Sequence, residues 1–365
     1  MFLGKEEVNI GRQVEFDYLK GLFVPMIILI HAFQLMGGTA EPFYEVFYPV
    51  CTLTGSTIFL FVMGLGSTYS KRTEKQMVIS GLKLIVWQIL WNIFALAVPF
   101  LLGYAIRDLL RLSTDMWSLV VGQSVVLLQY INIFFIAGVS YLFLALLKKL
   151  HIPTWGYFLI ATVLLIITPY FYITDFTTGF PCVDYILTAF CGGRDSVSLI
   201  LGPHLVYTLF GVWFGRIIRR TTDKNTLYKC IIPIASMIGI SYVAYAVFSC
   251  KTLTEFCNFM SYQYIFPTSM KMIVNLCWTL AMVAVLYWIS PWIKKSIWLH
   301  NKLLHFNYKT SAYYAIHPFL FCVITSVVAM EPLGCVSCIT LTVVNIIFSW
   351  HVVSIWENKF PTQIG

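Results

Sequence analysis

Charged side chains are scarce in this chain. Aspartate, glutamate, lysine and arginine together make up 11% of its 365 residues, whereas about 25% is typical of soluble proteins. A soluble domain of this length would need far more charge to cover its surface. The scarcity argues against a soluble enzyme, a disordered scaffold and a nucleic-acid-binding protein, even though the net charge is +8.

Long apolar runs take the place of charge, and 59% of the residues are hydrophobic. A membrane-crossing helix needs about 20 mainly apolar residues, and no soluble domain fits between the runs found here. We predict an all-α polytopic membrane protein with a single domain over residues 1–365. Its ten expected spans are 17–36, 47–69, 78–104, 120–147, 155–173, 197–218, 228–249, 269–290, 310–330 and 336–356.

Two of the apolar runs lead to further predictions. Residues 116–129 also suit a short re-entrant or interfacial segment before the fourth span. No small-residue cleavage site follows the first run, so we expect that run to remain as a helix rather than to be removed as a signal peptide.

Basic residues concentrate in every second segment between the expected spans. If the N-terminus is cytoplasmic, the inner segments hold 18 of the 24 lysine and arginine residues, and the outer segments hold five. Lysine and arginine concentrate on the cytoplasmic side of membrane proteins. We therefore predict that both termini are cytoplasmic.

Cysteines gather on the opposite side. Six of the ten fall in or beside expected outer loops: Cys182, Cys191, Cys250, Cys257, Cys335 and Cys338. An even number suggests disulfides in an oxidising compartment; pairing within each loop is one option, because the sequence leaves the connectivity open. The alternative is that they pack as small hydrophobic residues at the membrane edge. No histidine lies near these pairs in the sequence, so we expect no metal site.

The first span carries an aligned pair of polar residues. Lys20 and His31 are eleven residues apart, which brings them within about 20° of the same helix face and about 16 Å apart along the axis. Asp17 lies one turn before Lys20 and can pair with it. Alone, Lys20 suits an interfacial anchor, and His31 suits a core histidine bonded to a neighbouring helix. Their alignment favours a functional site.

This alignment suggests group transfer. A neutral imidazole is the usual general base near physiological pH, so His31 could take a proton from a hydroxyl or amine that attacks a thioester. The Lys20 ammonium would hold the phosphates of a cytosolic acyl donor. The separation of the two residues is comparable to the reach of a pantetheine arm.

The pattern Lys20-x10-His31, with Asp17 before it and Gly21 after it, resembles the first-helix motif of the transmembrane acyltransferase superfamily. That superfamily includes the acyltransferase-3 and heparan-α-glucosaminide N-acetyltransferase-like families. Three segments look like the second of these families, and a fourth looks like a late helix of both: 59–72, 130–141, 202–216 and 311–318. The resemblance implies a multi-span enzyme that takes an acyl group from acyl-CoA, most simply from acetyl-CoA.

Three departures from the family pattern limit what is carried over. The superfamily usually has arginine where this chain has Lys20, and acyltransferase-3 proteins typically have Ser-Gly-Phe where this chain has Met63-Gly64-Leu65. The heparan enzyme is thought to use a histidine in the loop after the first span, but residues 37–49 contain none. We therefore assign the base to His31 and do not carry over the heparan substrate.

Two inner basic clusters are candidates for binding the donor phosphates, and topology signals are the alternative. One contains Arg72 and Lys75, and the other contains Arg216 and Arg219. Arg216 and Arg219 share a helix face at i, i+3, which suits a phosphate clamp. His317 precedes Pro318, so it could bond to the donor arm or cap the carbonyls that the proline frees.

Intramembrane polar residues nearer the outer side are candidates for contacting the acceptor. These are Gln34, Asn132 and His204. For each, hydrogen bonding between helices is the alternative.

The sequence thus predicts an acyltransferase of the plasma membrane, expected in a bacterium. It would move an acyl group from cytosolic acyl-CoA to a hydroxyl or amine of an extracytoplasmic acceptor, often a glycan in such families, and would bind no nucleic acid. A secondary transporter is the main alternative, because intramembrane histidine and lysine also build proton relays. The Asp17-Lys20-His31 pattern has no second copy, which counts against the paired repeats of transporters.

Overall fold

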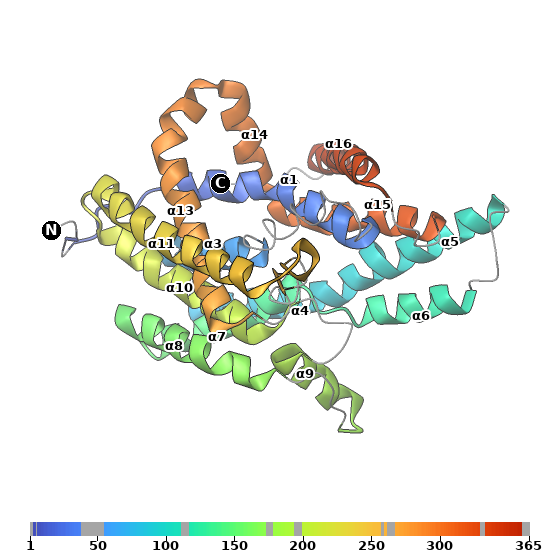
Figure 1. Ribbon diagram of the computed structural model, residues 1–365, viewed down its shortest axis with the longest axis horizontal. Coiled ribbons are helices and arrows are strands. Elements are labelled where there is room, and N and C mark those ends of the chain that lie inside the picture. Colours follow the sequence, from blue (N-terminus) through green and yellow to red (C-terminus); the bar gives the residue numbers. More distant parts are fainter. Residues whose placement is uncertain are drawn as a thin grey trace. The chain divides into compact units, whose positions relative to one another are not determined.

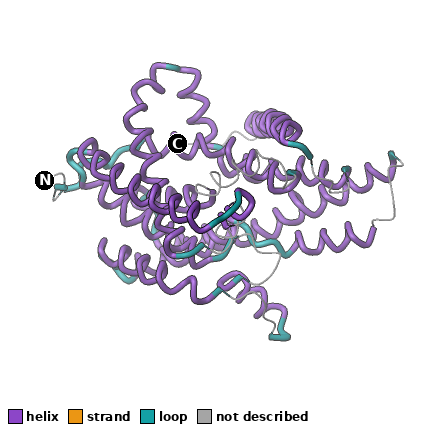
Figure 2. The backbone as a smooth tube through the Cα atoms, in the orientation of Figure 1, coloured by secondary structure: helices purple, strands orange, loops and turns teal. Residues whose placement is uncertain are grey.

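The computed structural model describes residues 3–4, 6–37, 55–110, 117–172, 178–192, 199–256, 259–260, 267–328 and 333–359. Within these ranges the regular structure is helical (Figure 2). Two isolated backbone bridges join described residues, Leu3 to Thr221 and Gly37 to Leu333. The predicted all-α class is therefore confirmed for the described residues.

The helices are labelled in Figure 1. They are α1 (Val14–Met36), α3 (Gly55–Tyr69), α4 (Glu74–Trp91), α5 (Val98–Leu109), α6 (Trp117–Leu128), α7 (Ile133–Lys149), α8 (Thr154–Ile167), α9 (Pro181–Cys191), α10 (Leu201–Arg220), α11 (Lys224–Ser249), α13 (Ser269–Lys295), α14 (Ile297–Tyr308), α15 (Thr310–Val327) and α16 (Cys335–Lys359). A π-helical turn, Asn92–Ala97, joins α4 to α5, and a 3₁₀ turn, Thr168–Phe171, continues α8.

Seven described helical segments are long and apolar enough to cross a membrane. They are Val14–Met36, Glu74–Leu109, Thr154–Phe171, Lys224–Ser249, Ser269–Lys295, Thr310–Val327 and Cys335–Trp356, and the shorter apolar helix Gly55–Tyr69 accompanies them. The chain is thus an all-helical protein whose composition and helix lengths are those of a membrane protein. The count of ten spans and the cytoplasmic termini stay predictions.

The chain forms two compact units, each assembled from segments that are distant in the sequence. Unit 1 contains Met1–Leu19, Thr52–Gln88 and Ile131–Lys295, and unit 2 contains Lys20–Cys51, Ile89–Tyr130 and Ser296–Gly365. Each unit has its own buried polar groups, described below. The single domain over residues 1–365 stays a prediction.

The expected span 120–147 differs most from the structure. It is divided between α6 and α7, because Asn132 begins a new helix there. The Oδ1 of Asn132 accepts a hydrogen bond of 2.8 Å from the backbone N–H of Phe134, which is an N-cap. The separate helix α6 coincides with the short segment expected at residues 116–129. The helices α9 and α14 are not among the expected spans, and residues 47–54 of the second span lie outside the described ranges.

The packing of α3 on α10 defines the centre of unit 1 (Figure 1). A Cβ built on Gly64 of α3 would lie 1.9 Å from the carbonyl oxygen of Thr208, and one built on Gly211 of α10 would lie 2.1 Å from that of Phe61. Because a glycine from each helix faces the backbone of the other, the two helices touch main chain to main chain. We call this contact the glycine seam.

The π-helical turn in unit 2 is accompanied by a buried side-chain amide that is hydrogen-bonded. The Nδ2 of Asn92 donates hydrogen bonds to the carbonyls of Leu128 (3.0 Å) and Tyr130 (2.8 Å), at the end of α6. Such turns are rare and cluster at functional sites. Here the turn places an amide where it satisfies carbonyls that a helix end leaves without partners.

Three of the six cysteines expected to form disulfides form no disulfide in the structure. These are Cys250, Cys335 and Cys338. Cys338 is buried, and its Sγ lies 3.8 Å from the carbonyl of Leu333. This packing corresponds to the alternative in which the cysteines act as small hydrophobic residues. The side chains of Cys182, Cys191 and Cys257 lie outside the described part.

Candidate functional site

Two histidines from opposite ends of the chain meet in unit 2. The Nδ1 of His31 on α1 lies 2.6 Å from the Nε2 of His317 on α15. Their rings are stacked, with centroids 4.9 Å apart and an angle of 16° between the planes. His317 is completely buried, and His31 is partly buried. The imidazole on the first helix therefore contacts a residue that lies 286 positions later in the sequence.

The hydrogen bonds fix which nitrogens carry protons. The Nδ1 of His317 lies 2.9 Å from the carbonyl oxygen of Tyr313, which can only accept, so this Nδ1 carries the proton. In a neutral imidazole the other nitrogen is then an acceptor, so the Nδ1–H of His31 must donate to His317. The Nε2 of His31 is left with its lone pair and with no hydrogen-bond partner in the described structure. It is the basic atom of the pair.

Aromatic and polar neighbours hold this pair in place. Tyr314 contacts both imidazoles edge-on, with centroid distances of 6.3 Å to His31 and 5.5 Å to His317. The ring of Trp91 stacks on Tyr314 at 5.6 Å, and the Nδ2 of Asn345 donates to the carbonyl of His317 at 2.7 Å. Such surrounding contacts restrict ring orientation, as a base needs for proton transfer.

The other polar residues of α1 are placed as follows. Lys20 is partly buried and lies on the same continuous helix as His31, as predicted. Asp17 pairs with Arg12. Gln34 is exposed near the end of the helix. A Cβ on Gly21 would lie 2.1 Å from the carbonyl oxygen of Leu303, so α1 and α14 are in backbone contact next to Lys20.

A pocket rich in cations lies in unit 1. Its volume is about 390 Å³, within the usual range for small-molecule sites, roughly 300–1,000 Å³. Its polar lining consists of Lys148, Arg216, Arg219, Arg220, Glu7, Ser67, Thr68, Ser70, Thr154 and Tyr157, and its apolar lining of Met77, Leu144 and Val212. Four cations against one carboxylate favour an anionic ligand. We call it the basic pocket.

The arginines of the basic pocket are held by the surrounding backbone and rings. Arg216 donates to the carbonyl of Ile152 at 3.1 Å and lies 4.5 Å from the centroid of the Tyr157 ring. Arg219 bonds to the carbonyl of Thr68 and pairs with Glu7. The guanidinium groups are therefore preorganised, and Arg216 has no carboxylate partner among the described residues.

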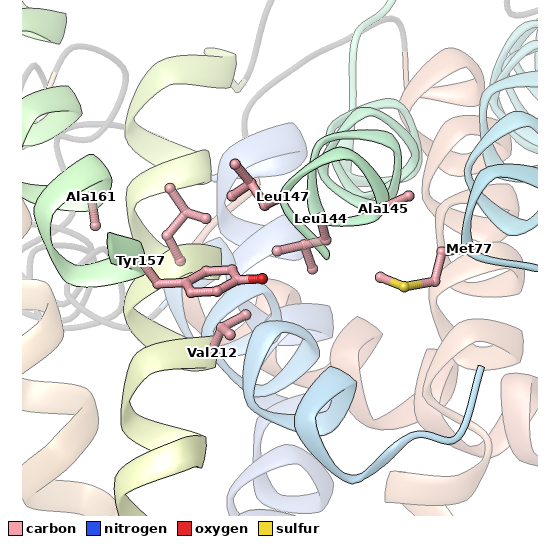
Figure 3. Close-up of a cluster of buried hydrophobic side chains, with 8 residues drawn as sticks. Met77, Leu144, Ala145, Leu147, Tyr157, Ala161 and Val212 are labelled. Carbon is pink, nitrogen blue, oxygen red and sulfur yellow. The ribbon is translucent and has the colours of Figure 1, made fainter. Parts of the chain in front are cut away.

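The inner wall of the basic pocket belongs to an apolar cluster. Figure 3 shows the Tyr157 ring extending from α8 between Leu144 and Val212, with Met77 beyond them. Thr154 begins α8, and the N-cap of this helix, Pro153, offers no side-chain acceptor to its first amides. A helix N-terminus and cations together form a typical phosphate site, and the apolar wall suits the less polar part of a ligand.

The structure separates the two predicted basic clusters. Arg216 and Arg219 line the basic pocket, and Arg72 and Lys75 are not part of its lining. Arg72 lies 5.9 Å from the Tyr141 ring, and its carbonyl accepts a hydrogen bond from Lys148. Lys75 is exposed on α4. Of the two clusters, the second therefore lines the basic pocket.

The remaining predicted residues are engaged in hydrogen bonds within the protein. The Nε2 of His204 lies 2.7 Å from the Oγ of Ser56, and its Nδ1 bonds to the carbonyl of Ile200. Asn132 caps α7, as described above. Both nitrogens of His317 are also occupied, which favours a role beside His31 over the donor contact that the sequence suggests.

Three participants were missed by sequence reasoning because they come from other helices. Lys148 and Tyr157 reach the basic pocket from α7 and α8, and Ser56 reaches His204 from α3. Lys148 at the end of an apolar run reads as a topology signal. Only the tertiary packing shows that Lys148 lines a pocket.

Comparison with models of protein families, with curated proteins and with solved structures finds no match for this chain.

Proposed function

We propose that this protein is a membrane acyltransferase in which His31 is the general base. The observation that carries the proposal is the hydrogen-bond chain from Tyr313 through His317 to His31, which leaves the Nε2 of His31 as an unprotonated acceptor. A base must present such a lone pair to the hydroxyl or amine that it activates. The resemblance of the first helix to transmembrane acyltransferases is the reason for proposing acyl transfer as the reaction.

The proposed step is direct transfer. The Nε2 of His31 takes the proton of the acceptor hydroxyl or amine while the acceptor oxygen or nitrogen attacks the thioester carbonyl of acetyl-CoA. The carbon–sulfur bond breaks, and the leaving thiolate of CoA is protonated by the His31 imidazolium. His317 shares the positive charge that forms on His31, because its Nε2 accepts the hydrogen bond from the Nδ1–H of His31.

The basic pocket supports an acyl-CoA donor. CoA carries several phosphates, and Arg216, Arg219, Arg220 and Lys148 line one cavity beside the N-terminus of α8. Charge-assisted hydrogen bonds to arginine suit phosphate oxygens. Lys20 stays a candidate contact for the donor, as in the sequence-based prediction. The acceptor is proposed to be an extracytoplasmic sugar or other small molecule, with Gln34, His204 and Asn132 as its candidate contacts.

The proposal is tested with radiolabelled acetyl-CoA, using membranes to measure transfer and the purified protein to measure binding. Membranes from cells that express the chain should transfer label to a carbohydrate or small-molecule fraction, and control membranes without the chain should not. Release of CoA should match the label transferred. If the protein neither binds nor consumes acetyl-CoA, the proposal fails.

A secondary transporter is the second candidate, because a chain of two histidines can also pass a proton. The two functions separate in proteoliposomes. A transporter would acidify or alkalinise the lumen when its substrate is added without acetyl-CoA. An acyltransferase would leave the lumenal pH unchanged under these conditions and would release CoA once acetyl-CoA is added.

Replacing Arg216 with glutamine should weaken binding of CoA by about 10-fold or more, because a hydrogen bond to a charged group contributes about 1.5–3 kcal/mol. Binding is measured by isothermal calorimetry in detergent. The matched control is Lys75→Gln, which removes an exposed cation outside the pocket lining. Equal losses in the two variants would mean that the pocket does not hold the donor.

Replacing His317 with phenylalanine should lower activity by about 10- to 100-fold without abolishing it, because the ring contact stays while the acceptor for the Nδ1–H of His31 is lost. His31 would then sample both tautomers, and the pH–rate profile should shift along the pH axis. An unchanged profile with a lower rate would indicate a structural role only. His351→Phe is the control, since His351 is exposed on α16.

A further inference from the structure

A lysine without a partner is buried in unit 1. Lys271 on α13 is completely buried, and its Nζ has no hydrogen-bond partner in the described structure. The Nζ lies 5.7 Å from the centroid of the Tyr242 ring on α11. Neither residue lines the basic pocket. This lysine therefore needs an explanation of its own.

Two more unpartnered polar atoms lie beside it. Asn275 follows Lys271 by one helical turn, and its Nδ2 donates to the hydroxyl of Tyr207 at 3.1 Å. That bond fixes the amide orientation, and its Oδ1 is buried with no partner in the described part of the chain. The hydroxyl of Tyr242 is also buried and unpartnered there. Two donor-capable groups, on Lys271 and Tyr242, and one acceptor, on Asn275, thus belong to one turn of α13 and to the α11 ring that Lys271 contacts.

Burial makes this arrangement costly for the chain alone. An ammonium removed from water without a counter-charge is strongly destabilising, and a contact with an aromatic face offsets only part of that cost. Lys271 also lies in the first turn of a 27-residue helix, where the helix dipole adds positive potential. Both effects favour an anion next to Lys271.

We propose that Lys271, Asn275 and Tyr242 form a binding site for a small carboxylate that also carries a hydroxyl or N–H group. One ammonium balances one negative charge, which favours a monocarboxylate over a phosphate dianion. The Oδ1 of Asn275 can only accept, so the ligand must supply a donor to it. The hydroxyl of Tyr242 can bond to the second carboxylate oxygen.

The apolar surroundings restrict the size of this ligand. Tyr242 packs with Met260 and Val274 in a buried cluster, and Phe256 and Phe259 pack against that cluster. A short chain of a few carbons suits such walls better than a sugar polymer does. The site goes beyond the proposed function, because the ligand binds there whether or not an acyl group is ever transferred to it.

The test uses three probes of nearly equal size: lactate, propionate and lactamide. Lactate has the carboxylate and the hydroxyl, propionate lacks the hydroxyl, and lactamide lacks the charge. After prolonged incubation of the full-length protein in detergent, lactate should raise the melting temperature most, propionate less, and lactamide not at all. A ligand that binds only the folded state raises its stability with concentration.

Variants separate the two parts of the site. Lys271→Met should abolish the response to both carboxylates, and Lys251→Met, the same change at an exposed lysine, should leave it unchanged. Asn275→Leu should keep the response to carboxylates and remove the preference for lactate over propionate. If Lys271→Met does not fold, the Asn275→Leu result still decides.

Two outcomes would overturn the inference. One is a wild-type protein whose melting temperature responds equally to lactate and lactamide, or to neither. The other is a Lys271→Met variant that folds and keeps the full lactate response. Neither outcome bears on the acyltransferase proposal, which is read from CoA release and label transfer.

Discussion

Acetyl transfer should fall by about 10²- to 10⁴-fold when His31 is replaced with alanine, which is the usual contribution of a general base. CoA binding should stay near the wild-type level, because His31 is not part of the lining of the basic pocket. The rate is measured by label transfer from acetyl-CoA and binding by calorimetry on the same preparation.

The control for this variant is His351→Ala. His351 is exposed on α16, and its Nδ1 bonds only to the carbonyl of Ile347 within the described structure. Its replacement removes a histidine from unit 2 without touching the hydrogen-bonded pair. If the His31→Ala variant transfers acetyl groups at the wild-type rate, His31 is not the base. This conclusion does not depend on whether CoA binds in the basic pocket.

The second large effect concerns stability. Replacing Gly64 with alanine should lower the free energy of unfolding by about 1–3 kcal/mol or more, because overpacking a tight contact costs that much. The new Cβ would lie 1.9 Å from the carbonyl oxygen of Thr208, so α3 and α10 must move apart. Thermal unfolding in detergent should show a clearly lower melting temperature.

Gly66 is the matched control on the same helix. A Cβ there meets nothing within 4 Å, and alanine is favoured over glycine in a helix by about 1 kcal/mol. Gly66→Ala should therefore leave the melting temperature unchanged or raise it slightly. Equal destabilisation by the two variants would mean that glycine at these positions serves something other than close packing.

The sequence predicted the alignment of Lys20 with His31 on α1 because that alignment depends only on local helix geometry. Lys20 and His31 share a helix, and their eleven-residue spacing aligns them without reference to other segments. The same holds for Arg216 and Arg219, whose i, i+3 spacing predicts a shared face. Local periodicity and apolar length also predict the all-α class.

The partners of these residues could not be read in the same way. His317 was singled out, but nothing in its own segment says that its ring meets His31 rather than a ligand, since that depends on how α15 packs on α1. The division of the span 120–147 depends on a hydrogen bond from one backbone amide to Asn132. Lys271, at the start of an apolar helix, reads as an interfacial residue until its burial is known.

The basic pocket has a consequence for the ionic environment of the protein. Its cations are partly open to solvent, since the side chain of Lys148 is 43% exposed and that of Arg219 is 25% exposed. Attraction between such groups and a ligand fades beyond a Debye length, which is about 8 Å at physiological ionic strength. The apolar packing and backbone contacts of the glycine seam carry no comparable sensitivity. Added salt should therefore lower the affinity for an anionic ligand and change the stability of the folded protein little.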